Sequence, residues 1–320
     1  MKMNLNKTRY LSSRNLVFGN KGMVATTVPL AAEAGLEILK NGGNAIDAAI
    51  ATAATLTVVE PTSNGIGGDA FAIIWYEGKL YGLNASGPSS SNININKVKN
   101  LGFNHMPKYG FLPVNVPGQP YGWKEMINRF GNLTLRKVLE PAINYAMDGY
   151  PVSTTVSENW ELAFENYKKE LKGSEFKEWF NTFTIDGKAP KPGQVWKSEN
   201  MANSLKELAD SECLSFYEGD IADKIHRFSK EYGGFISKED LKNYKPEWVE
   251  PIKANYRGYD IWELPPNNHG LVVLLALKIL NNLPMIDNNL DSYHYMIEAM
   301  KLAYVDGLKY ITDFRKMGIS

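Results

Sequence analysis

The stretch from residue 42 to residue 61, GGNAIDAAIATAATLTVVEP, decides how this chain folds. Its middle, residues 45–59, carries a single charge, Asp47, among alanine, threonine and branched aliphatic residues. A helix that is apolar on all sides is normally buried, and small side chains let other backbones approach closely. Asn44 suits the N-cap, and Asp47 three residues later completes a capping box. We therefore predict a buried helix from Ala45 to Val59.

The segments on either side extend this prediction to a layered core. Residues 29–40 have a helical pattern that starts at a proline and stops at two glycines. After the glycine-rich loop 62–69, residues 71–76 and 79–84 are rich in strand formers and flank a Glu-Gly turn, so we predict a hairpin. A strand pair behind a buried helix indicates an α+β domain with packed sheet and helix layers.

The rest of the chain continues the mixture of helices and strands. The segment 119–150 is predicted to be helical in two pieces, the second restarting at Glu140-Pro141, and 158–177 to be an exposed helix. Further predicted elements are helices over 201–209, 219–232, 270–280 and 293–311, a capping box at 237–240, and a hairpin over 252–256 and 259–264. The last helix places Tyr293, Ile297, Met300, Tyr304 and Leu308 on one stripe. No repeat or linker divides the chain, so residues 1–320 are predicted to form one domain.

Composition excludes several classes of protein. Lysine plus arginine and aspartate plus glutamate both number 35, so the chain lacks the basic excess of nucleic-acid and membrane-surface proteins. Its one cysteine, Cys213, allows no intrachain disulfide and is predicted to be a small core residue. Residues 1–20 lack the apolar region of a secretory signal, and no apolar stretch is long enough to span a bilayer. We expect a cytoplasmic protein.

The loop Gly65-Ile66-Gly67-Gly68-Asp69-Ala70 formally matches a dinucleotide fingerprint. That motif needs a strand before it and a helix after it, whereas here a helix precedes and a strand follows. We therefore expect no nucleotide. Gly65, Gly67, Gly68 and Asp69 are predicted to form a backbone loop near the site, where a substrate or another segment comes close. A purely structural turn is the alternative.

The residues alone identify no reaction. The four histidines share no metal-binding spacing, and no Gly-x-Ser-x-Gly motif is present, so we expect no metal site and no nucleophile elbow. In Asn84-Ala85-Ser86-Gly87-Pro88 the chain leaves a strand for a tight turn. Ser86 there either caps the turn or lines a pocket at the strand end.

Several short segments, in their order along the chain, resemble the large-subunit portion of the γ-glutamyltransferase (glutathione hydrolase) family. The matching segments run from about Gly22 to Asp313 and include Gly42–Ala49, Val59–Pro61, Gly65–Gly68, Val116–Gly118, Glu140–Ala142, Phe216–Gly219, Tyr256–Tyr259, Leu264–Pro266 and Glu298–Tyr304. The turn at 84–88 and the segment Pro265–Gly270 are similar to the acylase-like branch of that family.

This resemblance implies an N-terminal-nucleophile (Ntn) hydrolase with a four-layer αββα sandwich, of which this chain is the large-subunit portion. Such enzymes arise from a precursor that cleaves itself before a threonine. That threonine becomes the N-terminus of a small subunit, attacks the γ-glutamyl amide and passes the acyl group to water or an amino acid. No cofactor is implied.

Two departures from the family pattern shape the functional hypothesis. The chain stops at Ser320, before the position of the family's threonine, so it holds no catalytic nucleophile and is expected to be inactive alone. The arginine with which the family binds the substrate's α-carboxylate is replaced by Ser86, which lacks a bidentate guanidinium. Asn84, Ser86, Gly87 and Pro88 are therefore the candidate residues of the acyl pocket.

We accordingly expect the large chain of an enzyme that cleaves or transfers γ-glutamyl or related acyl amides in glutathione metabolism. Its partners would be a small subunit with an N-terminal threonine and a small acyl amide. The alternative is a non-catalytic relic or interaction protein that keeps the fold. Because half of a shared core is missing, the isolated chain is expected to expose apolar sheet surface and self-associate.

Overall fold

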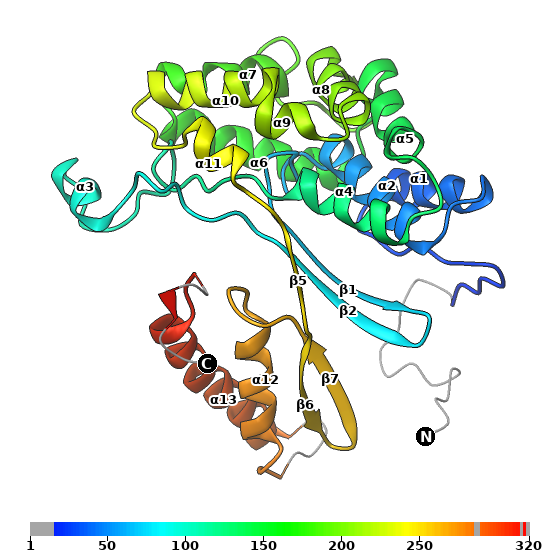
Figure 1. Ribbon diagram of the computed structural model, residues 1–320, viewed down its shortest axis with the longest axis vertical. Helices are drawn as coiled ribbons and strands as arrows, with labels where there is room; N and C mark the ends of the chain where they lie inside the picture. Colours follow the sequence, from blue (N-terminus) through cyan, green and yellow to red (C-terminus); the bar gives the residue numbers. More distant parts are fainter. Residues whose placement is uncertain (1–15, 285–288, 314–315, 318–320) are drawn as a thin grey trace.

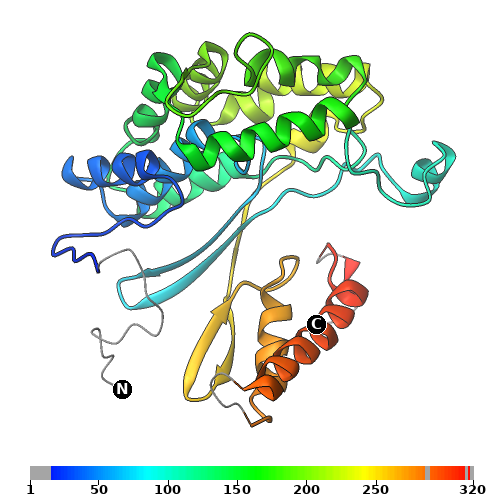
Figure 2. The ribbon, with the colours of Figure 1, turned by 180° about the vertical axis from the view of Figure 1, so that it is seen from behind.

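A computed structural model of the chain describes residues 16–284, 289–313 and 316–317. Residues 1–15, on which most of the secretory-signal prediction depends, lie outside the described residues. A broad helical layer covers one side of the β1-β2-β5 sheet, and a smaller unit of two strands and two helices follows it in the chain (Figure 1). The view from behind shows the same two parts (Figure 2).

Helices α1 (Pro29–Lys40) and α2 (Ala45–Val59) form a closely packed hairpin. The predicted capping box is present: the Asn44 side chain accepts from the Asp47 amide at 3.1 Å, and the Asp47 carboxylate accepts from the Asn44 amide at 2.8 Å. A Cβ atom on Gly35 of α1 would lie 2.3 Å from Thr52 Oγ1 of α2. Eleven of the fifteen residues of α2 are buried, which confirms the prediction of a core helix.

The predicted hairpin follows the glycine-rich loop. Strands β1 (Ala70–Tyr76) and β2 (Lys79–Ala85) pair antiparallel, and Ala70 lies opposite Ala85. Glu77 and Gly78 both have positive φ, as the tight turn between the strands requires. A third strand that the pattern did not predict, β5 (Glu247–Val249), pairs with β2, so that the order is β1-β2-β5. Within the described residues β1 is therefore an edge strand.

The prediction of a helix break at Glu140-Pro141 is wrong. Helix α4 spans Gln119–Phe130, and α5 runs without interruption over Leu135–Asp148 with Pro141 inside it. The break lies earlier, at residues 131–134, where the Thr134 side chain caps α5. Pro141 is buried, and the packing of the apolar face of α5 holds the helix together although the proline lacks an N–H.

The segment predicted to be an exposed helix over 158–177 is a half-buried one. Helix α6 begins earlier, at Thr154, and ends at Glu170, and its Trp160 and Phe164 are buried. Trp160 also donates a hydrogen bond from Nε1 to the Phe183 carbonyl at 2.9 Å. The sequence pattern missed the burial of Trp160 and Phe164, which are four residues apart, because charged residues occupy the outer face of the helix. After α6 come the 3₁₀-helix η1 (Ser174–Phe176) and α7 (Lys177–Phe183).

The remaining elements complete the helical layer. Two short strands, β3 (Tyr150–Pro151) and β4 (Val195–Trp196), pair with each other. Helix α3 (Ile95–Asn100) lies apart from the layer (Figure 1). The last four helices of the layer are α8 (Glu199–Asp210), α9 (Leu214–Glu218), α10 (Asp220–Glu231) and α11 (Lys238–Lys242). The predicted capping box from Ser237 to Asp240 starts α11. Cys213 is fully buried, which confirms its prediction as a core residue.

The final unit contains the second predicted hairpin and two helices. Strands β6 (Ile252–Tyr256) and β7 (Tyr259–Glu263) are joined by a turn at 257–258, and α12 (Gly270–Leu280) packs against them and against α13 (Leu290–Tyr310). The predicted stripe on α13 is exposed, from 39% at Met300 to 81% at Leu308. The buried residues of that helix include Ala299, Ala303 and Gly307.

These parts give the chain an α+β fold, as predicted. The β1-β2-β5 sheet and the β6–β7 hairpin touch at the end of β7, where Leu264 packs against Gly82 of β2. Helices lie beyond each of them, the large helical layer on one side and α12–α13 on the other (Figures 1 and 2). This is the large-subunit share of the αββα arrangement. Among the described helices none combines the length and the apolar character needed to cross a bilayer. The division into one domain stays a prediction.

Candidate functional site

The glycine-rich loop brings a second segment of the chain close to its backbone. The Gly68 carbonyl accepts from the amides of Gly118 and Gln119, at 3.0 and 3.1 Å. The Gln119 side chain donates back to the Gly65 carbonyl at 3.2 Å. Helix α2 precedes this loop and strand β1 follows it, so the context that a dinucleotide requires is absent here, as the sequence predicted.

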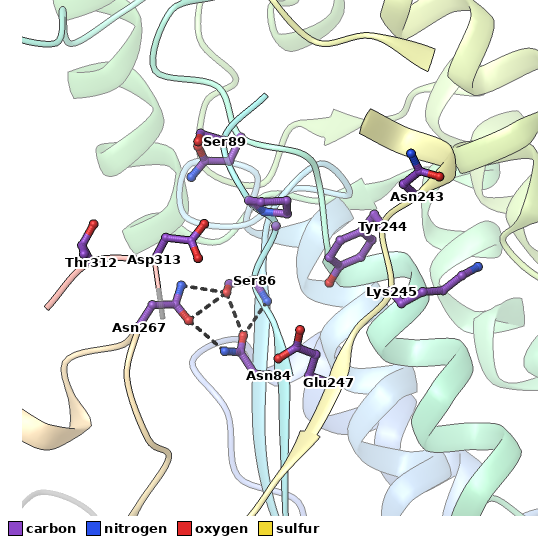
Figure 3. Close-up of a pocket in the computed structure, with 13 residues that line it drawn as sticks. Asn84, Ser86, Ser89, Asn243, Tyr244, Lys245, Glu247, Asn267, Thr312 and Asp313 are labelled. Carbon is purple, nitrogen blue, oxygen red and sulfur yellow. Dashed lines mark hydrogen bonds between the residues drawn. The ribbon is translucent and has the colours of Figure 1, made fainter. Parts of the chain in front are cut away.

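A compact polar network forms where β2 ends. Asn84 Oδ1 accepts from both the amide and the hydroxyl of Ser86, at 3.0 and 2.7 Å. The Asn84 amide nitrogen donates to Asn267 Oδ1 at 2.8 Å, and the Asn267 nitrogen donates to Ser86 Oγ at 3.0 Å. Asn267 belongs to the loop between β7 and α12, so this network joins segments about 180 residues apart (Figure 3). Ser86 thus caps its own turn and also faces a pocket.

The network borders a cavity of about 480 Å³. All four candidate acyl-pocket residues line it, and they are Asn84, Ser86, Gly87 and Pro88. The other lining residues come from the turn after β2, from the loop before α4, from the segment around the start of β5, from the loop before α12 and from the residues after α13; they are Ser89, Asn115, Asn243, Tyr244, Lys245, Glu247, Asn267, Thr312 and Asp313. A cavity of this size is typical of a small-molecule site.

A second cavity of about 510 Å³ adjoins the first. The two share Ser86, Gly87, Asn115 and Asn267 as walls. Three of the predicted loop residues, Gly67, Gly68 and Asp69, line the second cavity, whereas Gly65 is absent from its lining. The two groups of residues that the sequence singled out therefore lie at adjoining cavities.

Two glycines allow the backbone to pass closely beneath the site. A Cβ atom on Gly87 would lie only 1.4 Å from the Val116 carbonyl oxygen, and one on Gly118 only 2.0 Å from the Ala85 carbonyl oxygen. Neither residue needs a positive φ, so the requirement is for space and not for backbone conformation. These approaches fix the turn after β2 against the segment before α4.

Asp240 does not line the first cavity, but it fixes the position of the wall that Asn243, Tyr244, Lys245 and Glu247 form. Its carboxylate accepts from the Ser91 amide at 2.9 Å, from the Ser90 hydroxyl at 2.8 Å, and from the amide and hydroxyl of Ser237. Partial burial by itself would raise the pKa of Asp240, but the hydrogen bonds from Ser91 and Ser237 outweigh it and lower the pKa to about 2. These hydrogen bonds tie the segment after β2 to α11, which leads into the lining residues Asn243, Tyr244, Lys245 and Glu247.

Tyr244 contributes a buried hydroxyl to the same wall. The side chain is 5% exposed, and within the described part of the chain its hydroxyl has no hydrogen-bond partner. Burial, followed by the negative charges of Glu247 and Asp69, raises the pKa of Tyr244, so the phenol stays protonated at neutral pH. In Figure 3 its oxygen points toward the space between Ser86 and Glu247.

The sequence left several residues of this wall unassigned. Asn115 comes from one segment and Tyr244 and Glu247 from another, far along the chain, and none of the three carries a local pattern that marks a site. Only the Asn-Asn pair in the loop after Pro266 carried a signal, through its similarity to the acylase-like branch.

The described residues hold no group of three or more histidine, cysteine or acidic side chains placed to bind a metal ion. Burial raises the pKa of the Cys213 thiol to about 12, so it is not a thiolate nucleophile.

Comparison with known proteins identifies the family. The family model of gamma-glutamyltranspeptidase matches residues 31–320. The chain is 35% identical to the glutathione hydrolase-like YwrD proenzyme of Bacillus subtilis, over 93% of this chain and 56% of that protein.

Two solved structures are also similar. The cephalosporin acylase from Bacillus halodurans is 50% identical with a TM-score of 0.94, over 100% of this chain and 60% of the acylase chain. The γ-glutamyltranspeptidase of Helicobacter pylori is 29% identical with a TM-score of 0.87, over 95% of this chain and 88% of that chain.

The family match covers most of this chain, which spans about half the length of the curated relatives it matches. Several of those relatives are proenzymes, as the resemblance implied. The chain belongs to the γ-glutamyltranspeptidase family of Ntn hydrolases and has an acylase among its structural neighbours.

Proposed function

We propose that this chain is the large-chain part of an amide hydrolase or acyltransferase whose nucleophile is supplied by a downstream polypeptide. The observation that carries the proposal is the polar cavity of about 480 Å³ at the end of β2. It is lined by Asn84, Ser86, Gly87 and Pro88, which we propose as residues of the acyl pocket. Cytoplasmic location and a role in glutathione metabolism belong to the same proposal.

The chemistry needs a group that the described residues do not supply. Ser86 donates its hydroxyl to Asn84 at 2.7 Å, and its hydrogen-bond partners among the described residues are asparagines, which cannot act as a base. In the proposed reaction the downstream threonine oxygen attacks the amide carbon, and its own α-amine takes the hydroxyl proton. The C–N bond breaks, the leaving amine receives the proton, and water or an amine then attacks the acyl ester.

The edge of the sheet offers a surface for that polypeptide. Strand β1 has no neighbour on its outer side among the described residues. Its Phe71, Ile73 and Trp75 are 40%, 42% and 70% exposed. An unpaired edge with apolar side chains favours addition of another strand and burial against another chain.

The acyl substrate is proposed to be γ-glutamyl or a related group. A γ-glutamyl group carries an α-carboxylate, for which the usual partner is a bidentate guanidinium. At that position the chain has Ser86, and Lys245, the only cation among the described lining residues, points away from Ser86 in Figure 3. This favours the acylase side of the family.

Reconstitution tests the proposal. The chain would be expressed alone and together with the part of the Bacillus halodurans acylase that it does not cover, and assayed on a panel of acyl p-nitroanilides. We expect no turnover from the chain alone and release of nitroaniline from the complex. The matched control carries alanine in place of the partner's N-terminal threonine, and it should form the complex without turnover.

The alternative function makes a different prediction in the same experiment. A relic or interaction protein would bind the partner, as judged by co-elution in size-exclusion chromatography, yet hydrolyse no anilide. A complex that forms and stays inactive on the whole panel would therefore favour the non-catalytic function.

A further inference from the structure

The orientation of one amide side chain fixes the polarity of the whole network. The backbone N–H of Ser86 is always a donor, and it lies 3.0 Å from the Asn84 side chain. The atom that Asn84 turns toward it must therefore be Oδ1. The amide nitrogen of Asn84 then faces Asn267, which must present its own oxygen at 2.8 Å.

The same reasoning determines the donor and acceptor roles of Asn267 and of the Ser86 hydroxyl. With its oxygen turned to Asn84, Asn267 presents its nitrogen to Ser86 Oγ at 3.0 Å. Ser86 then gives its hydroxyl proton to Asn84 Oδ1 at 2.7 Å. Each side chain in the ring thus has a determined donor and acceptor role.

A count of the remaining hydrogen-bonding capacity shows what the ring still offers. Each primary amide nitrogen carries two N–H groups, and Asn84 and Asn267 each use one within the ring. One N–H remains on each. Ser86 Oγ and Asn267 Oδ1 each retain one lone pair, while both lone pairs of Asn84 Oδ1 are used by Ser86. The unused capacity beside the cavity is therefore two N–H donors and two acceptor lone pairs, a combination that a primary carboxamide matches with its own oxygen and nitrogen.

The charges around the cavity indicate which acceptor fits. The Lys245 ammonium lies 5.0 Å from the centre of the Tyr121 ring, and Figure 3 shows its side chain directed away from Asn84 and Asn267. Glu247 and Asp313 bring carboxylates to the lining. A substrate carboxylate would find no charged fork of donors here, whereas a neutral carbonyl oxygen is matched by single amide N–H groups.

We propose that Asn84 and Asn267 bind the far end of the acyl group, and that this end is a neutral group with an acceptor oxygen, such as a carboxamide. The proposal rests on the function proposed above, because it assigns the acyl end of that cavity. Asn84 and Asn267 are specificity residues in this assignment, and the bond to be cleaved lies elsewhere.

Three substrates of nearly equal shape test it on the reconstituted complex: the glutaramoyl, glutaryl and isoheptanoyl p-nitroanilides. They end in a carboxamide, a carboxylate and a dimethyl group. We expect kcat/KM to be highest for glutaramoyl, by at least about tenfold, since a site built to hydrogen-bond a group rejects analogues that lack it. Higher activity on glutaryl, or equal activity on isoheptanoyl, would overturn the proposal.

Two variants sharpen the assignment. Asn267→Asp replaces the donor nitrogen by an oxygen of the same size, and Asn84→Asp does the same at the other end of the ring. Each should lower kcat/KM for glutaramoyl by about tenfold or more and leave isoheptanoyl within about twofold. Asn159→Asp, at an exposed position on α6, is the matched control and should change none of the three. Equal losses on all three substrates would indicate a structural role instead.

A binding measurement separates this proposal from the hydrolase proposal. Glutaramide and glutarate would be titrated calorimetrically into the chain without its partner. Preferential binding of glutaramide, lost in Asn267→Asp, would support the acyl-end assignment even if the complex hydrolysed nothing. Preferential binding of glutarate would contradict it, whatever the complex does.

Discussion

The two parts of the molecule differ in how far each completes its own core. The main body, formed by α1–α11 with the β1-β2-β5 sheet, encloses a continuous core that includes Trp123, Trp160 and Trp196. In the terminal unit, formed by β6, β7, α12 and α13, the buried cluster comprises Val272, Ala276 and Ala303. Since buried apolar area is the main source of stability, most of the chain's internal stabilisation lies in the main body, whereas α13 of the terminal unit leaves an apolar stripe exposed.

The largest expected loss of stability comes from a substitution in the main body. Asp47 is fully buried and accepts from the amides of Asn44, Asn132 and Leu133, at 2.8, 2.9 and 3.3 Å. Asp47→Ala would leave these three N–H groups without an acceptor, so we expect the free energy of unfolding to fall by about 3–4 kcal/mol. Urea denaturation measures it.

A matched substitution in the terminal unit provides the contrast. Asp306→Ala removes a carboxylate from an exposed position on α13 and should change the free energy of unfolding by less than about 0.5 kcal/mol. A loss below about 1 kcal/mol for Asp47→Ala would mean that the hydrogen bonds of Asp47 at the start of α2 contribute little to the stability of the main body.

Sequence patterns predicted the main body better than the site, and the reason is physical. The capping box of α2 and the hairpin β1–β2 depend on neighbours within a few residues, so periodicity and cap residues predict them. The break before α5 was misplaced because Pro141 looked like a local stop, whereas tertiary packing carries the helix past it. Local signals say little about such packing.

The site depends on partners that no local pattern links. Asn84 and Ser86 were predicted as pocket residues, and they do line the cavity, but Asn267 and Tyr244 reach it from segments more than 150 residues away. The stripe on α13 was predicted correctly as a stripe, yet its exposure follows from what surrounds the helix and not from its own sequence.

An intermediate effect on stability comes from the hydrogen bonds of Asp240, which lie next to the cavity wall, and it depends on pH. The folded-state pKa of Asp240, about 2, lies below the ordinary value of 3.8, so folding favours the ionised form. The stabilisation is complete above pH 4 and is lost as the pH falls toward 2. Because the group is partly exposed, we expect a contribution of about 1 kcal/mol after allowing for solvent screening.

Acid titration of the urea midpoint tests this contribution. The wild-type chain should lose more stability than Asp240→Asn between pH 4 and pH 2, by about 1 kcal/mol. The variant should already be less stable at pH 7, by a similar amount. Parallel pH profiles for the two proteins would show that Asp240 is not held in its ionised form by Ser91 and Ser237.

The smallest expected effect on stability is in the terminal unit, and it tests directly whether the apolar stripe of α13 is unused within this chain. Ile297 and Leu308 on the α13 stripe are 60% and 81% exposed, so replacing both by serine should change the free energy of unfolding by less than about 0.5 kcal/mol. The same replacement removes apolar surface that favours association of the isolated chain. We therefore expect the wild-type chain to shift toward larger species with concentration in light scattering, and the double variant to do so less.

Val272→Ser in the same unit is the matched control, because Val272 is 2% exposed and packs with Ala276 and Ala303. It should lower the free energy of unfolding by about 1–3 kcal/mol, since it buries a hydroxyl in an apolar contact. If the stripe variant instead unfolded as readily as Val272→Ser, then α13 would already use its apolar face within this chain. The terminal unit would then be complete in itself, and the difference between the two parts of the molecule would have to be explained without a missing partner.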